Sequence, residues 1–98
     1  MEIHLTGRNI ELTPALKAFA TEKLQKLERR GDGIAHVYVT FHVEKLKHTA
    51  EATLHVLGTD LHAEGTAEDM YSALDQLTDR MVQQITRLKE KTEGGRTA

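Results

Sequence analysis

Basic side chains recur at helical spacing in two segments of the chain, and such side chains can bind the phosphates of nucleic acids. Near the C-terminus, a stripe with the spacing i, i+4, i+7 and i+11 consists of Arg80, Gln84, Arg87 and Lys91. Nearer the N-terminus, a second stripe with the spacing i, i+3 and i+7 consists of Lys23, Lys26 and Arg30. If the two helices pack side by side, their exposed faces can merge into one basic surface for RNA.

The segregated distribution of charge supports this use, although most stripes of Lys and Arg are ordinary solvated helix faces. The net charge is −2 over 98 residues, which taken whole argues against nucleic acid. Residues 14–30 and residues 80–98 each carry a net charge of +3, whereas residues 31–79 carry a net charge of −7. Because salt limits the reach of each charge to about 10 Å, local segregation matters more than the total.

Histidines offer a second possible chemistry, the binding of a metal ion. The chain has 6 His, which is many for its length. The ones expected to point to the same side of a sheet are His4, His42, His55 and His62. Imidazole is a common zinc ligand. No pair shows a tight spacing with a carboxylate, so we expect a polar open sheet face without a metal.

Catalytic chemistry finds little support in the sequence. Ser72 is the only Ser, there is no Cys, and no Gly-rich phosphate loop or zinc-protease motif occurs. We therefore predict that the protein is not an enzyme and has no cofactor and no small-molecule substrate. No apolar run approaches the roughly 20 residues of a membrane span, and the first residues do not resemble a signal peptide. A cytoplasmic protein is expected.

The elements that position these side chains follow from periodicity. Period-two alternation predicts strands over residues 2–6, 34–43, 50–56 and 61–64. Thr13 and Pro14 have the residue types of a helix N-cap and first turn, and apolar residues at helical spacing follow to Leu27. Gly31 to Gly33 should end this helix.

A second, longer helix is expected over about residues 67–91. Apolar residues alternate in steps of four and three from Met70 to Leu88. Thr66 to Asp69 resembles a capping box, which would place Glu68 and Asp69 in the first turn. Residues 92–98 contain no large apolar side chain and are predicted to form a disordered tail.

The order of elements predicts an α+β domain over residues 1–91. Its β-α-β-β-β-α order and one apolar face per strand require a four-stranded sheet with both helices on one face. The first crossover makes the first two strands parallel, and short loops make the rest an antiparallel meander. Such a domain is similar to a double-stranded RNA-binding domain.

Several segments together resemble the short hibernation promoting factor family of bacteria, which is close to the translation inhibitor called protein Y. The segments are Glu11-Leu12-Thr13, Lys23…Lys26-Leu27-Glu28, Val37-Tyr38-Val39, Val43-Glu44-Lys45…His48, Ala52-Thr53-Leu54-His55-Val56, Leu61-His62-Ala63 and Asp69-Met70-Tyr71…Ala73…Asp75…Leu77…Asp79. The resemblance covers residues 2–91 without gaps. The most specific part is the Glu-Lys…His and Ala-Thr-Leu-His-Val pair followed by Asp-Met-Tyr.

The resemblance implies a ribosome hibernation factor that acts by occlusion. Family members bind the small ribosomal subunit in the mRNA and tRNA channel, inactivate ribosomes in stationary phase, and assist ribosome pairing with ribosome modulation factor. Their contacts to rRNA imply Lys23, Lys26, Arg80, Arg87, Lys89 and Lys91 here, and the two stripes add Arg30 and Gln84. Gly33 and Gln83 stand where the family has basic residues, which removes positive charge. Absence of the long form's second domain implies that pairing needs the partner.

Three alternatives remain open from the sequence. One is a protein Y-type inhibitor that keeps ribosomes monomeric, against which the short, non-acidic tail speaks. The second is a general double-stranded RNA-binding module, which would bind free duplex RNA as well as ribosomal subunits. The third is an adaptor that binds a protein or a metal through the His-rich sheet face.

Overall fold

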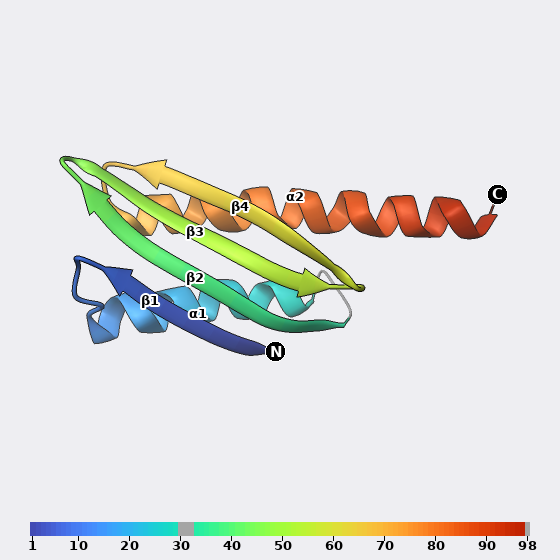
Figure 1. Cartoon of the computed structure of the whole chain (residues 1–98), viewed down its shortest axis with the longest axis horizontal. Coiled ribbons are helices and arrows are strands. Elements are labelled where there is room, and N and C mark those ends of the chain that lie inside the picture. Colours follow the sequence, from blue (N-terminus) through green and yellow to red (C-terminus); the bar gives the residue numbers. More distant parts are fainter. Residues whose placement is uncertain (30–32, 98) are drawn as a thin grey trace.

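The computed structural model contains the six predicted elements in the predicted order (Figure 1). It describes residues 1–29 and 33–97, with residues 92–97 described by their backbone alone. The elements are β1 (Glu2–Arg8), α1 (Pro14–Glu28), β2 (Ile34–Glu44), β3 (Lys47–Val56), β4 (Thr59–Ala67) and α2 (Met70–Thr97). The fold predicted from periodicity is thus confirmed.

The four strands form one mixed sheet in the order β1-β2-β3-β4. Strands β1 and β2 are parallel, and the two following pairs are antiparallel, as the loop lengths predicted. The register aligns Val37 with Leu54 and Ala52 with Ala63. These residues are all buried, so the period-two pattern identified the inner face correctly. The turn between β3 and β4 consists of Leu57 and Gly58, which both have positive φ angles, the conformation that tight hairpins require.

Both helices cover the inner face and leave the other face of the sheet open. Figure 1 looks onto the open face, with α1 and α2 behind the strands. Helix α1 begins as predicted, because the backbone N–H of Leu16 donates a 3.1 Å hydrogen bond to Thr13 Oγ1 and Pro14 occupies the first turn. The buried apolar residues of the helices are Leu16, Ala20, Leu24, Leu27, Met70, Ala73, Leu74, Leu77, Met81 and Ile85.

Strand β4 is longer than expected, and a glycine in it allows α2 to pack closely. The pattern predicted a short strand around Leu61 and Ala63, whereas β4 runs from Thr59 to Ala67. A Cβ atom on Gly65 would overlap the carbonyl oxygen of Ala73 and would lie 2.7 Å from the backbone nitrogen of Leu77. The alternation of apolar residues did not predict this part of the strand, because Gly65 and Thr66 are not large apolar residues. Gly65 is needed there for close packing against α2.

Helix α2 differs from the prediction at both ends. It begins at Met70, and Asp69 caps it: the backbone N–H and the hydroxyl of Ser72 each donate a 2.8 Å hydrogen bond to the Asp69 carboxylate. The predicted capping box at Thr66 is therefore wrong, because β4 extends through Thr66. At the other end α2 continues to Thr97, past the predicted end at residue 91. The helix can continue there because residues 92–97 include no Pro, and because Gly weakens a helix without breaking it.

Two expectations on the whole chain can be set beside this structure. The α1-β2-β3-β4-α2 order fits the comparison with double-stranded RNA-binding domains. No helix among the described residues is long and apolar enough to cross a membrane.

Candidate nucleic-acid interface

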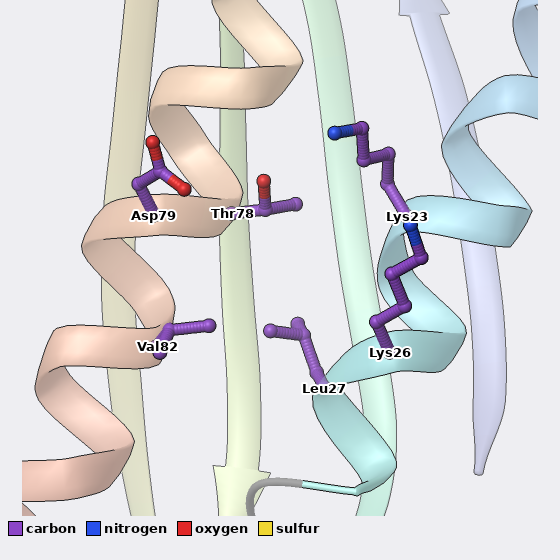
Figure 2. A pocket seen from close by; sticks show the side chains of 6 residues that line it. All are labelled: Lys23, Lys26, Leu27, Thr78, Asp79 and Val82. Carbon is purple, nitrogen blue, oxygen red and sulfur yellow. The ribbon is translucent and has the colours of Figure 1, made fainter.

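Two residues of the N-terminal basic stripe, Lys23 and Lys26, lie where α1 faces α2. The buried stripe of α1 anchors it on the sheet and leaves these two lysines beside the neighbouring helix. They border a groove of about 160 Å³, which is also lined by Leu27, Thr78, Asp79 and Val82. Figure 2 shows Thr78 and Val82 of α2 pointing toward α1 across this groove. The groove is therefore cationic on its α1 side and acidic on its α2 side.

Lys23 is engaged by the protein itself. Its Nζ atom lies 2.6 Å from Asp75 Oδ1 of α2 and 5.5 Å from the centre of the Phe19 ring. The hydrogen bond to Asp75 raises the pKa of Lys23 above its ordinary value of 10.5, although partial burial opposes this effect. The lysine is thus charged at neutral pH, but Asp75 already compensates much of that charge.

Lys26 differs from Lys23 because it is exposed and, among the described residues, makes no ion pair. Its charge remains available to a phosphate. Arg30, the third residue of this stripe, lies outside the described residues, so its predicted role stays a prediction.

Arg80 and Gln84 point to the free edge of β4. Arg80 Nη1 donates a 2.7 Å hydrogen bond to the carbonyl oxygen of Glu64, and Gln84 Nε2 donates a 2.7 Å hydrogen bond to that of His62. One turn earlier, Gln76 Oε1 accepts a 3.3 Å hydrogen bond from the backbone N–H of Thr66. We call Gln76, Arg80 and Gln84 the edge-capping residues, because β4 pairs with another strand only on its other side.

The remaining predicted contacts lie toward the C-terminal end of α2. Arg87 and Lys91 are exposed, are one helical turn apart, and make no ion pair with the rest of the described chain. Lys89 lies between them in sequence, is half-buried and has a partner within the protein. Figure 1 shows the C-terminal end of α2 extending beyond the sheet and beyond the end of α1.

The structure therefore separates the predicted surface into parts with different environments. Lys23 and Lys26 border the groove, Arg80 and Gln84 bind the β4 edge, and Arg87 and Lys91 lie exposed farther along α2. Asp75 and Asp79 come between the first part and the last. The expectation of one merged basic surface needs correction, because α2 is acidic where it runs beside α1.

The open face of the sheet contains a group that the sequence analysis missed. Glu2, His4 and His36 offer ligand atoms that all lie within 4.8 Å of one another. Glu2 and His4 are two residues apart on β1, and this spacing was a usable signal. His36 was not among the candidates, and only the β1–β2 register places it beside Glu2.

Comparisons with known proteins give consistent results. Residues 3–93 match the family described as Sigma 54 modulation protein / S30EA ribosomal protein. The chain is 47% identical to the ribosome hibernation promoting factor of Escherichia coli (strain K12) over 91 residues, which cover 93% of this chain and 96% of that protein. It is 43% identical to the Azotobacter vinelandii protein of the same name, over 93% of this chain and 85% of that protein.

Solved structures share the fold. A ribosomal subunit interface protein from Coxiella burnetii superposes with a TM-score of 0.83 at 29% identity, over 92% of this chain and 99% of that chain. The N-terminal domain of Thermus thermophilus protein Y also gives a TM-score of 0.83, at 32% identity, over 90% of this chain and 99% of that one.

Proposed function

The chain belongs to the Sigma 54 modulation protein / S30EA ribosomal protein family, and on this premise we propose that it is a ribosome hibernation factor. It binds the small ribosomal subunit in the mRNA and tRNA channel and keeps the ribosome inactive in stationary phase and stress. The observation that carries this proposal is the similarity to ribosome hibernation promoting factors, which extends over 93% of the chain. A factor of this kind acts in the cytoplasm, where ribosomes are.

The mechanism is occlusion and requires no reaction. A two-layer domain with a sheet on one side and two packed helices on the other is a rigid body that can fill an RNA channel. The exposed cations Lys26, Arg87 and Lys91 neutralise rRNA phosphates and release counterions. In this mechanism the factor blocks the channel by its presence and performs no chemistry on its target.

The other predicted contact residues contribute to rRNA binding to different extents. Lys23 reaches rRNA only in competition with Asp75, which lies 2.6 Å away. Arg80 and Gln84 support the interface mainly by holding α2 against β4. Arg30 and Lys89 keep the role that the family resemblance implies. We place the binding domain in residues 1–91.

Ribosome pairing is the second part of the proposal. We infer that the chain assists pairing together with ribosome modulation factor, and that it does not keep ribosomes monomeric as a protein Y-type inhibitor would. Sucrose gradients of purified ribosomes check this. Paired ribosomes should increase when both factors are present, and a decrease would favour the inhibitor.

Co-sedimentation with small ribosomal subunits tests the binding surface. The variant K26E/R87E/K91E should lose association, because all three exposed cations become acidic. The matched control K17E/K45E/K47E has the same change in net charge at other exposed lysines and should bind like the parent protein. Equal losses in both variants would show that binding follows total charge and not this surface.

Competition with free duplex RNA separates the proposal from a general double-stranded RNA-binding module. A hibernation factor should stay on the subunit in the presence of excess duplex, since channel shape adds to phosphate contact. Displacement at equimolar duplex would favour the general module.

A further inference from the structure

Two adjacent parallel strands place three metal-ligand side chains together on the open face of the sheet. The β1–β2 register aligns Glu2 with His36 and His4 with Tyr38. Side chains on one face of neighbouring strands stand close enough to act together. Figure 1 shows β1 and β2 side by side on the face that the helices leave open. The cluster is thus separate from the cations of α1 and α2.

The distances within the cluster suit a small cation. Glu2 Oε2 lies 3.2 Å from His36 Nδ1, and Glu2 Oε1 lies 3.8 Å from His4 Nε2. Zinc bonds of 2.0–2.1 Å in a tetrahedron place ligand atoms about 3.3 Å apart. All three ligand atoms lie within 4.8 Å of one another, so the side chains must draw together to reach that separation. The three side chains are between 41% and 67% exposed, so the cluster as a whole lies at the surface.

The two imidazoles are held in place for this role. The His4 ring stacks on the Tyr38 ring, with centres 4.7 Å apart and planes 11° apart. The Nδ1 atom of His36 is shielded from solvent and makes no hydrogen bond of good geometry in the protein. A shielded imidazole nitrogen beside a carboxylate, with no donor to satisfy it, is available to a metal ion. The amino terminus does not compete, because it pairs with Glu28 at 3.1 Å.

We propose that Glu2, His4 and His36 form a binding site for one Zn²⁺ ion or a divalent transition metal ion of similar preference. Two imidazole nitrogens and one carboxylate oxygen supply three ligands, and water completes the fourth position. Carboxylate charge favours the dication, and nitrogen ligands favour zinc over magnesium or calcium. From the sequence we expected no metal, because no pair of histidines showed a tight spacing with a carboxylate and His36 was not among the candidates.

Other histidines on the same face provide matched controls. His55 Nδ1 lies 2.8 Å from Asp60 Oδ1, and His42 Nε2 lies 3.8 Å from Glu51 Oε1. Each of these pairs brings one imidazole and one carboxylate. They share the chemistry of the cluster but lack its second imidazole, so they should bind zinc much more weakly.

Calorimetric titration of the untagged full chain with Zn²⁺ tests the site. The parent protein should bind one ion per chain. H4Q, H36Q and E2Q should each weaken binding by more than the roughly 10- to 100-fold typical of losing an outer-shell partner. H55Q should bind like the parent, and far-UV circular dichroism should show all variants folded.

Two results would overturn the site. One is the absence of saturable binding near one ion per chain, and the other is an equal loss of affinity in H55Q and H36Q. The variant K26E/R87E/K91E should bind Zn²⁺ unchanged. The zinc site and the ribosome-binding surface can therefore fail independently.

Discussion

At the scale of single residues, the ion pair between Lys23 and Asp75 limits what the groove can offer to RNA. A basic residue contributes to phosphate binding only to the extent that its charge is not already compensated. Lys26 has no such partner in the described chain, whereas Lys23 must exchange Asp75 for a phosphate. The two lysines look equivalent in sequence and are unequal in the fold.

Replacing Asp75 by Asn should therefore strengthen ribosome binding. Loss of the carboxylate lets the pKa of Lys23 fall back toward its ordinary 10.5, so the lysine stays charged at neutral pH. The Asp75 carboxylate is negative, as the phosphates are, and competes with them for Lys23. Its removal should make the binding free energy more favourable by about 1 kcal/mol, which lowers Kd several-fold. The free energy of unfolding should fall by less than about 1 kcal/mol, since the pair is partly exposed. D60N removes the same charge on the open face and should leave Kd unchanged; equal gains would contradict a local effect.

Asp69 gives a prediction on pH. Hydrogen bonds from the backbone and side chain of Ser72 hold the pKa of Asp69 below its ordinary 3.8. A lowered pKa in the folded state means that the ionised cap stabilises the fold above about pH 3.8 and that this stabilisation is lost as the pH falls through the lowered pKa. D69A should therefore lower the melting temperature at pH 7, with a smaller difference at the acid end. E68A is the control, and an equal or larger effect of E68A would contradict capping by Asp69.

The sequence predicted which residues share a face but not which atoms they bind. Period two identified Val37 and Val39 as buried and His62 as exposed, because alternation follows from strand geometry alone. Helical spacing likewise grouped Arg80, Gln84, Arg87 and Lys91. It could not divide them, since the partners of Arg80 and Gln84 are carbonyl groups of β4 that the spacing within α2 does not reveal.

At the scale of elements, α2 closes the edge of the sheet. Strand β4 has unpaired backbone groups on its outer side, and such an edge can pair with another chain. Gln76, Arg80 and Gln84 bind three of these groups, at Thr66, Glu64 and His62. Their spacing of four residues matches the two-residue step of a strand, because both rise by about 6 Å. A stripe that resembles an RNA contact in sequence thus has a structural role.

Removing one edge-capping residue should expose β4. Q84A loses the hydrogen bond to His62 and should lower the free energy of unfolding by about 0.5–1.5 kcal/mol in a denaturant titration. Light scattering at high protein concentration should also rise, because the edge becomes available for pairing. Q83A is the neighbouring control: Gln83 is exposed and makes no side-chain hydrogen bond within the described part of the chain, so its loss should cost less than about 0.5 kcal/mol. Similar behaviour of both variants would mean that the edge is closed by other contacts.

At the scale of the whole molecule, the negative net charge does not by itself favour the proposed binding to RNA. The chain is acidic overall, with a net charge of −2, yet its proposed target is RNA. The structure reconciles the two by position: acids gather on the sheet and the first half of α2, while Arg87 and Lys91 are exposed in its second half, whose C-terminal end extends past the sheet (Figure 1). Under the proposed function, we therefore expect association to depend on a few exposed cations and not on the net charge of the protein.

The salt dependence of ribosome binding measures how many of those cations meet phosphates. Each phosphate contact contributes about −0.7 to −0.9 to the slope of log K against log salt concentration. Lys26, Arg87 and Lys91 alone predict a slope of about −2 to −3, and the other proposed contacts make it steeper. The variant K26E/R87E/K91E should lose about two to three units of slope as well as affinity. If affinity falls while the slope stays the same, these cations do not contact phosphates, and their effect on binding must come through protein contacts on the subunit.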